Sequence, residues 1–375
     1  MAKRSSGEHT TVLRGTVLSS VPRDTERSHY LAVIAGDKPG QRIRLSPQPV
    51  VIGRSAPADW ILTDEEVSRT HCRVYLALDE VIVVDLESSN GTYIEGKRLT
   101  AGAALPIGAR LQLGTHVIEH EWLTRQEVEE LQALDQDEEK AAHYIRSLIP
   151  KPLSSGPVVS DWTLIPSPRL GGDAFGYRWL SDRKLAIYII DVSGTGAGAA
   201  MHAVSVLNIL GRGALPVTDF GNPANVLETL NVMFEGRFHG GMSVSVWYGV
   251  YDTESRRLKY GTAGHHPSIL VPAKRDKVIP LETDAPEIGV KKGYRFKAAS
   301  VAVPPQTKLY VFSDGVFEYV TKDGTVGTID EFAALVRRPP LANKTESQRI
   351  LAEVQKRAVS DTFEDDFALA TFTFL

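Results

Sequence analysis

The sequence predicts a multidomain protein in which an all-β sandwich precedes an α/β domain whose antiparallel sheets are covered by helices. Three observations support this fold class. Residues 30–123 consist of short apolar runs broken about every 8 to 12 positions by turn residues, which is typical of a β sandwich or barrel. Residues 124–149 lack glycine and proline and repeat apolar side chains three and four positions apart, which indicates one helix. Beyond residue 155, strand-like and helix-like segments mix, and consecutive strands are joined by short turns.

These changes of pattern give the expected domain boundaries. Residues 1–28 mix Ser, Thr, Arg and Glu with few apolar side chains, so we expect a flexible tail there. We expect the β sandwich over residues 29–123, a linker helix over 124–150 and the α/β domain over 151–375.

The composition narrows the classes of partner and of site. The chain has 375 residues, a formal net charge of −4 and a sequence pI of about 6.2. Because it has no overall basic field, neither nucleic acid nor a membrane surface is expected as a partner. The single cysteine, Cys72, excludes an internal disulfide and a cysteine-based metal cluster. We therefore expect a cytoplasmic protein, since no apolar run approaches the roughly 18 residues that a membrane span requires.

The expected linker helix has two interpretations. Thr124 and Glu127 form a capping box at its start, and Pro150 ends it. Its apolar seam consists of Val128, Leu131, Leu134, Ala141, Ile145 and Leu148. The seam either packs on a neighbouring domain or forms a coiled coil that joins two subunits as a homodimer, and the sequence leaves both open. In both cases we expect Leu134 and Ile145 to be buried.

Aspartates occupy strand ends throughout the second half of the chain. Asp173 follows "RLGG", Asp191 ends "LAIYIID", Asp314 ends "LYVFSD", and Asp365 and Asp366 precede "FALATFTF". One such aspartate is usually a turn or capping residue. Four such strand ends, three of them near glycines that allow close backbone approach, offer the oxygen ligands that Mg²⁺ and Mn²⁺ prefer. The sequence therefore predicts a site for hard cations.

Six motifs of this half resemble those of the metal-dependent protein phosphatases of type 2C, in the bacterial branch that includes the stage II sporulation E phosphatase. In chain order they are "SLIPKPL", "GGDAFG", "DVSGTGAGAAM", "AGHHPSIL", "SDGVFE" and "EDDFALATF". The resemblance covers the chain from about residue 140 to residue 375. It implies two antiparallel sheets between helical layers (αββα) and hydrolysis of phosphoserine or phosphothreonine by a water that two metal ions activate.

The resemblance also implies the metal ligands. Asp191 would bridge two Mn²⁺ or Mg²⁺ ions, and the carbonyl of Val192 would contribute a further ligand. Asp173 would serve one ion, and Asp314 and Asp365 the other. These four aspartates are therefore the candidate catalytic residues.

Other positions qualify this assignment. Arg169, four residues before Asp173, is a candidate clamp for the substrate phosphate, although a loop arginine is more often solvated. Asp366 is expected beside the metals rather than on them. Gly176 and Ala368 stand where the family often has Asp and Thr. They support an alternative, in which a catalytically weakened phosphatase domain acts as a scaffold.

Four stretches of the first half together resemble the forkhead-associated (FHA) domain, which binds phosphothreonine peptides through its loops. They are "VVIGRS", "VSRTHC", "LESSNGTYIEG" and "LPIGARLQLG". The resemblance covers roughly residues 30 to 120. Charged and hydroxyl side chains in these stretches suit a phosphate dianion. The contacts it implies are Arg54, Ser68, Arg69, Ser89 and Asn90.

Together the two halves predict a metal-dependent serine/threonine protein phosphatase that is targeted or regulated by phosphothreonine binding. The expected partners are a phosphorylated protein substrate and a phosphothreonine-containing protein or kinase.

Overall fold

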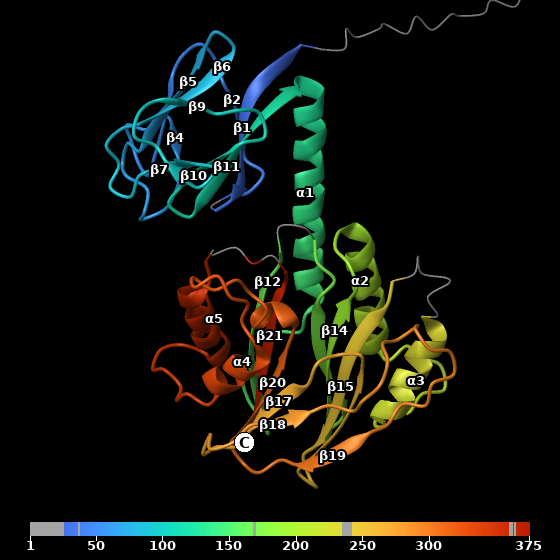
Figure 1. Ribbon diagram of the computed structural model, residues 1–375. Helices are drawn as coiled ribbons and strands as arrows, with labels where there is room; N and C mark the ends of the chain where they lie inside the picture. Colours follow the sequence, from blue (N-terminus) through green and yellow to red (C-terminus); the bar gives the residue numbers. More distant parts are fainter. Residues whose placement is uncertain (1–25, 37, 168–169, 235–241, 360–362, 364) are drawn as a thin grey trace, which may run out of the picture.

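The computed structural model describes residues 26–36, 38–167, 170–234, 242–359, 363 and 365–375. An N-terminal β sandwich stands above a C-terminal α/β unit, and helix α1 (Arg125–Leu148) runs from the first to the second (Figure 1). The multidomain fold class predicted from the sequence is confirmed. No helix in the described part of the chain combines the length and the apolarity that a membrane crossing requires.

The sandwich consists of two sheets around one apolar core. Their strand orders are β2-β1-β11-β10-β7-β8 and β4-β3-β5-β6-β9. Alternate side chains of the strands point inward, as Cys72 and Val74 do from β5, and meet Ile52 and Leu111 of neighbouring strands. The strands are β1 (Arg27–Ala35), β2 (Arg42–Arg44), β3 (Val50–Gly53), β4 (Trp60–Ile61), β5 (Cys72–Ala77), β6 (Glu80–Asp85), β7 (Thr92–Ile94), β8 (Lys97–Arg98), β9 (Ala103–Ala104), β10 (Arg110–Leu113) and β11 (His116–Thr124).

The expected tail needs one correction. Strand β1 begins at Arg27, because Arg27 and Ser28 pair with Thr124 and Leu123 of β11, so a tail of residues 1–28 is two residues too long. The rest of that prediction, residues 1–25, lies outside the described residues.

Helix α1 begins as the sequence predicts. The Thr124 side chain accepts a hydrogen bond from the backbone of Glu127, whose carboxylate accepts one from the Thr124 backbone. A partly buried ion-pair cluster then fastens the helix to the sandwich. Arg42 of β2 donates to Glu121 of β11 at 2.9 Å and to Asp135 of α1 at 2.9 Å. The first half of α1 is thus held against the sandwich edge.

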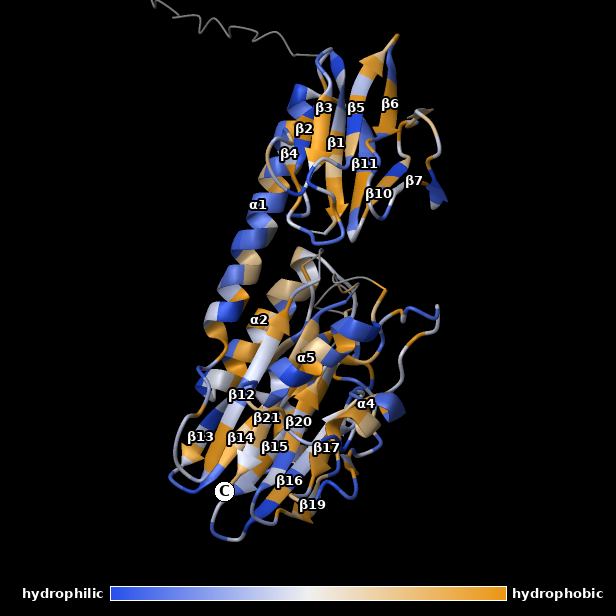
Figure 2. Ribbon diagram, turned by 90° about the vertical axis from the view of Figure 1, so that its left-hand side faces the viewer, coloured by the Kyte–Doolittle hydropathy of each residue, from blue (hydrophilic) through white to orange (hydrophobic). Residues whose placement is uncertain are grey.

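The second half of α1 packs on the α/β unit. Ile145 is buried with Leu170 and Ala200, as predicted for this residue. Leu134 is 56% exposed, so its predicted burial against the α/β unit is wrong for this chain. The reason is the direction of its side chain: the next residue, Asp135, binds Arg42 of the sandwich, whereas Leu134 points away from it to solvent. Figure 2 shows that this middle part of α1 is largely hydrophilic.

The α/β unit contains two five-stranded antiparallel sheets. Their strand orders are β12-β21-β20-β17-β18 and β13-β14-β15-β16-β19. The strands are β12 (Val158–Ile165), β13 (Ala174–Ser181), β14 (Lys184–Val192), β15 (Val244–Asp252), β16 (Arg257–Ala263), β17 (Ser268–Val271), β18 (Ile279–Leu281), β19 (Ala299–Ala302), β20 (Thr307–Phe312) and β21 (Phe367–Phe374). The helices are α2 (Ala197–Arg212), α3 (Pro223–Met233), α4 (Ile329–Val336) and α5 (Glu346–Arg357), with a 3-10 turn, η2 (Asp314–Val316).

Three apolar clusters make this unit a four-layer αββα structure, as expected. Trp247 and Phe372 lie in the cluster between the two sheets. Helices α2 and α3 cover the outer face of the β13–β19 sheet, where Leu207 and Leu227 are buried. Helices α4 and α5 cover the other sheet in the same way (Figure 1).

The direction of the strands decides where their ends meet. Strands β14 and β20 run toward the end of the unit that faces the sandwich, and their antiparallel partners β13 and β21 start there (Figure 1). The residues just before β13 and β21 and just after β14 and β20 therefore share one end of the molecule.

Candidate functional site

The four predicted metal ligands meet at this shared end. Asp173 directly precedes β13, Asp191 is the second-last residue of β14, Asp314 begins η2 after β20, and Asp365 precedes β21. One carboxylate oxygen of each of Asp173, Asp314 and Asp365 lies within 4.8 Å of the others. Asp191 is close enough that its pKa is raised by repulsion from Asp314 and Asp365, in addition to burial. The structure therefore brings all four together.

Glycines make this close approach feasible. A Cβ on Gly171 would lie 1.8 Å from Oδ2 of Asp366, and one on Gly315 would lie 2.3 Å from the Asp366 carbonyl oxygen. A Cβ on Gly172 would lie 2.6 Å from the carbonyl oxygen of Val192, the predicted backbone ligand. Any larger residue would therefore force these loops apart.

Asp366 supports the cluster from one side. Its carboxylate accepts hydrogen bonds from the backbone N–H of Ser167 at 2.8 Å and of Asp173 at 3.2 Å. Its carbonyl oxygen accepts a bond from Ser313 Oγ at 2.9 Å, and Ser313 Oγ accepts one from the N–H of Ala368. These bonds connect the start of β13, the end of β20 and the start of β21.

The electrostatics of the cluster favour a bound cation. Burial, followed by repulsion from Asp191 and Asp366, raises the pKa of Asp173 well above its usual value. Burial, followed by repulsion from Asp314 and Asp365, raises the pKa of Asp191 to about 7. Oδ2 of Asp173 is also buried without a hydrogen-bond partner among the described residues. Because carboxylate oxygens are the ligands that Mg²⁺ and Mn²⁺ prefer, these residues fit such ions.

Two neighbours of Asp191 were not predicted from the sequence. Ser245 of β15 is paired with Asp191 in the sheet, and its Oγ donates to Oδ2 of Asp191 at 3.3 Å. Glu287 adds to the repulsion that raises the pKa of Asp191. A serine inside the apolar run "SVSVWYGV" was the available signal for Ser245, but its use requires knowing which strand pairs with β14.

Arg169, the predicted clamp for the substrate phosphate, lies outside the described residues, so its role stays a prediction. Gly176 of β13 packs beneath Tyr188, whose ring would lie 2.6 Å from a Cβ at that position. A carboxylate at 176 would therefore require Tyr188 to move, so the absence of an acidic residue there follows from local packing.

The five residues predicted to contact a phosphopeptide lie on three loops of the sandwich. The loops are bonded to one another. The N–H of Arg54 donates to the carbonyl of Ser68 at 2.9 Å, and the N–H of Ser89 donates to Ser68 Oγ at 3.0 Å. Asn90 Nδ2 donates to the carbonyl of Glu66 at 2.9 Å. The structure thus brings Arg54, Ser68, Arg69, Ser89 and Asn90 to neighbouring loops.

Buried polar groups stiffen these loops from below. His71 accepts a bond from the N–H of Ser68 at 3.1 Å, and its Nε2 lies 3.1 Å from the carbonyl of Gly91. The Asp85 carboxylate accepts bonds from the hydroxyl groups of Ser88 and Thr92, each at 2.6 Å. Burial alone would raise the pKa of Asp85, but these hydrogen bonds outweigh it and lower the pKa.

The cations of these loops are available for a ligand. Arg54 and Arg69 are exposed, and neither forms an ion pair with any residue in the described part of the chain. Beside Asn90 the surface is hollowed by about 470 Å³, with Glu66, Tyr93 and Gln112 in its walls. The arrangement suits a ligand with a doubly charged anion and an extended chain.

Comparison with protein families agrees with both sites. The family described as "Stage II sporulation protein E (SpoIIE)" matches residues 181–374, and the FHA domain matches residues 50–114. The chain belongs to the SpoIIE family and carries an FHA domain.

Individual relatives match one half each. The FHA domain-containing protein FhaB of Mycobacterium tuberculosis is 40% identical over 107 residues, which are 28% of this chain and 68% of FhaB. Phosphoserine phosphatase RsbU of Bacillus subtilis is 28% identical over 161 residues, which are 43% of this chain and 47% of RsbU. The match therefore spans about half the length of RsbU.

A solved structure supports the fold of the SpoIIE-type domain. The SiaA-PP2C domain of Pseudomonas aeruginosa superposes with a TM-score of 0.53 at 18% identity, covering 64% of this chain and 96% of that domain. The SpoIIE-type domain of this chain therefore has the fold of that PP2C domain and is joined to an FHA domain.

Proposed function

We propose that this chain is a cytoplasmic metal-dependent serine/threonine protein phosphatase that hydrolyses phosphoserine or phosphothreonine in a protein substrate. The observation that carries this proposal is the carboxylate cluster, in which one oxygen each of buried Asp173, half-buried Asp314 and exposed Asp365 lie within 4.8 Å of one another. Oδ2 of Asp173 has no hydrogen-bond partner in the described residues. We propose a sandwich domain over residues 29–123, extended at its start by Arg27 and Ser28 of β1, a linker helix over 124–150 and an α/β domain over 151–375.

Asp173, Asp191, Asp314, Asp365 and the carbonyl of Val192 would hold two Mn²⁺ or Mg²⁺ ions. Such a pair lowers the pKa of water and stabilises the charge that develops as water attacks phosphorus. Asp191 is oriented for this role by Ser245, and the loop of Asp173 is held by Asp366.

The charges in and around the cluster would favour cation binding and orient the substrate. Because Asp173 is buried, Asp191 is half-buried and their carboxylates repel one another, the free energy of the cluster falls when divalent cations bind. Arg169 would then orient the substrate phosphate through paired hydrogen bonds.

The FHA domain would bind a phosphothreonine-containing protein or kinase through Arg54, Ser68, Arg69, Ser89 and Asn90. The guanidinium groups of Arg54 and Arg69 support this, since neither is ion-paired within the described residues and each can form charge-assisted hydrogen bonds to a phosphate dianion.

The proposal is tested with the full chain and p-nitrophenyl phosphate. We expect turnover that depends on added Mn²⁺ or Mg²⁺ and is abolished by a chelator. In parallel, a library of phosphothreonine peptides should yield binders that lose affinity when dephosphorylated. Phosphopeptide binding without any metal-dependent turnover would instead favour the alternative, a catalytically weakened scaffold.

A further inference from the structure

The phosphothreonine loops and the carboxylate cluster face each other. Strand β11 ends at Thr124, directly before α1, so its first residue, His116, marks the opposite end of the sandwich. Thr115 donates to Asp64 at 2.8 Å, which places the loop of Ser68 at that same end. Figures 1 and 2 show this end directed toward the end of the α/β unit at which β14 and β20 finish.

The facing arrangement is held by contacts at both ends of α1. Arg42 binds Asp135 on the sandwich side, and Ile145 is buried with Leu170 on the side of the α/β unit. Leu170 is three residues from Asp173 in the chain. The helix between these contacts is continuous, so it fixes both the distance and the rotation between the two units.

Contacts along α1 also give the axial distance between the facing edge of the sandwich and the loop of Asp173. A Cβ on Gly40, in the turn between β1 and β2, would lie 2.7 Å from the Asp135 carboxylate, and a Cβ on Gly36 of the same turn would lie 2.5 Å from the His116 ring. The facing edge of the sandwich is therefore level with residue 135, and the loop of Asp173 is level with residue 145. Ten residues of helix at 1.5 Å each separate them by about 15 Å.

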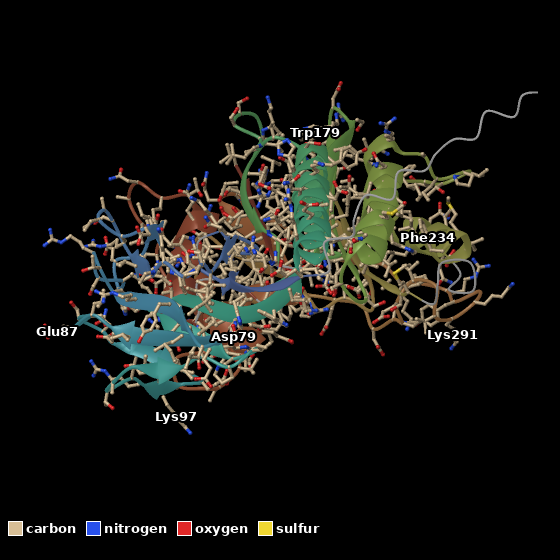
Figure 3. The ribbon with its side chains drawn as sticks, turned by 90° about the horizontal axis from the view of Figure 1, so that it is seen from above. Asp79, Glu87, Lys97, Trp179, Phe234 and Lys291 are labelled. Carbon is tan, nitrogen blue, oxygen red and sulfur yellow. The ribbon has the colours of Figure 1, made fainter. Side chains whose placement is uncertain are left out.

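The two units also overlap sideways. Seen from above, the sandwich with Asp79, Glu87 and Lys97 lies over the half of the α/β unit that contains α4 and α5, while Phe234 and Lys291 lie beyond α1 on the other side (Figure 3). Figure 1 shows the same overlap from the front. An extended chain of about five residues covers 15 Å, and a few more residues would cover the sideways offset.

We propose that the substrate is a doubly phosphorylated polypeptide. The FHA loops hold a phosphothreonine of this chain while a second phosphorylated serine or threonine, about five or more residues away, reaches the carboxylate cluster. This inference rests on the proposed function and deepens it by naming the substrate class. Tethering would raise the local concentration of the second phosphate group to the millimolar range, because the connecting segment is short.

The test uses the full chain with Mn²⁺ and two synthetic peptides. One carries phosphothreonine and, 12 residues along a Gly/Ser-rich spacer, phosphoserine; its control carries threonine in place of phosphothreonine. Phosphate loss at each position is followed by mass spectrometry. We expect a KM for phosphoserine hydrolysis at least tenfold lower for the doubly phosphorylated peptide, with kcat unchanged. A separate phosphothreonine peptide added in excess should remove this advantage.

Two helix insertions test whether the geometry is responsible. Two alanine residues inserted between Gln136 and Asp137 rotate the sandwich by about 200° around α1. A seven-residue helical insertion at the same place adds almost two full turns, so the net rotation is only about 20° while the helix becomes about 10 Å longer. We expect the two-residue insertion to lose the KM advantage and the seven-residue insertion to retain at least part of it. Both variants should still hydrolyse p-nitrophenyl phosphate and bind phosphothreonine peptide.

Three results would overturn the inference while leaving the proposed function intact. They are equal KM values for the two peptides, an advantage that survives the two-residue insertion unchanged, and inhibition of p-nitrophenyl phosphate turnover by bound phosphothreonine peptide. Absence of all metal-dependent turnover, or of all phosphothreonine binding, would instead reject the proposed function itself.

Discussion

The phosphothreonine loops and the carboxylate cluster are both built at strand ends, but they treat charge in opposite ways. Arg54 and Arg69 are exposed, and the polar groups beneath them already satisfy one another. Asp173 is buried and Asp191 half-buried, both beside other carboxylates, so their pKa values are raised. The first site is therefore stable before its ligand arrives, whereas the second gains stability only when cations bind.

This difference has a consequence for what each substitution does. Removing a charge from the loops removes a ligand contact and little else. Removing a charge from the cluster also relieves repulsion, so function and fold stability respond in opposite directions. Variants of the two regions can therefore be distinguished by measuring both properties.

The largest effect is expected from Asp191→Asn. The amide keeps the shape of the side chain but has no charge to offer the cations, so metal-dependent turnover of p-nitrophenyl phosphate should fall by more than about 100-fold. Thermal unfolding without metal should show no loss of stability, since a half-buried carboxylate that is repelled by Asp314 and Asp365 has been neutralised. Asp182→Asn, an exposed aspartate in the turn at the far end of the same hairpin, is the control. Near-normal turnover at saturating Mn²⁺ would contradict the site assignment.

The helix that connects the two regions offers a second, smaller effect. Ile145→Ala should lower the free energy of unfolding by about 2–4 kcal/mol, because it opens a cavity against Leu170 and Ala200. Leu134→Ala should change it by less than about 0.5 kcal/mol, since Leu134 is 56% exposed in a single chain. Urea unfolding measures both values.

Sedimentation of the same two variants addresses the homodimer. A large loss of stability in Leu134→Ala, together with a shift to a smaller species, would mean that α1 buries Leu134 against a second copy. The helix would then join subunits as well as the two regions of one chain.

These comparisons show what a sequence can and cannot reveal. The grouping of Asp173, Asp191, Asp314 and Asp365 was predictable because each stands at the end of an apolar strand, in short motifs that resemble those of a known family. Ser245 was not, because its contact with Asp191 depends on the pairing of β14 with β15. The exposure of Leu134 could not be predicted either. The periodicity of a helix identifies its apolar face but does not show how far each neighbouring domain extends along that face.

The facing of the two sites depends on similarly distant contacts. Arg42 and Asp135 are far apart in the sequence, and only the fold shows that their ion pair fixes α1 against the sandwich. The grouping of Arg54, Ser68 and Asn90 on neighbouring loops was predictable because each belongs to one of the short motifs that resemble an FHA domain.

The phosphothreonine loops should respond to Arg54→Ala by a loss of affinity of about 10- to 100-fold. One charge-assisted hydrogen-bond donor is removed, and such bonds contribute about 1.5–3 kcal/mol. Fluorescence anisotropy with a labelled phosphothreonine peptide measures this. Arg73→Ala, an exposed arginine on β5, is the matched control and should keep the wild-type affinity. Equal losses in both variants would show that only the general positive charge matters.

The smallest expected effect is a loss of stability of the sandwich at acid pH, to which His29 contributes. Burial, followed by repulsion from His120, lowers the pKa of His29, and the opposing attraction from Asp79 is weaker. His120 Nδ1 lies 2.6 Å from the carbonyl of Leu105, and His29 Nδ1 lies 2.8 Å from His120 Nε2. A further proton on His29 would therefore sit on Nε2, which is buried without a partner among the described residues.

The sign of the pH dependence follows from this geometry. A histidine whose folded pKa is lowered stabilises the fold above its unfolded pKa of about 6.5, and this contribution is lost as the pH falls below that value. The melting temperature of the sandwich should therefore decrease between pH 7 and pH 5.5. His29→Phe, which keeps a ring against Trp122, should reduce this decrease, whereas His143→Gln on the exposed surface of α1 should not. If both variants follow the wild-type curve, the acid sensitivity of the sandwich arises elsewhere than in the His29–His120 pair.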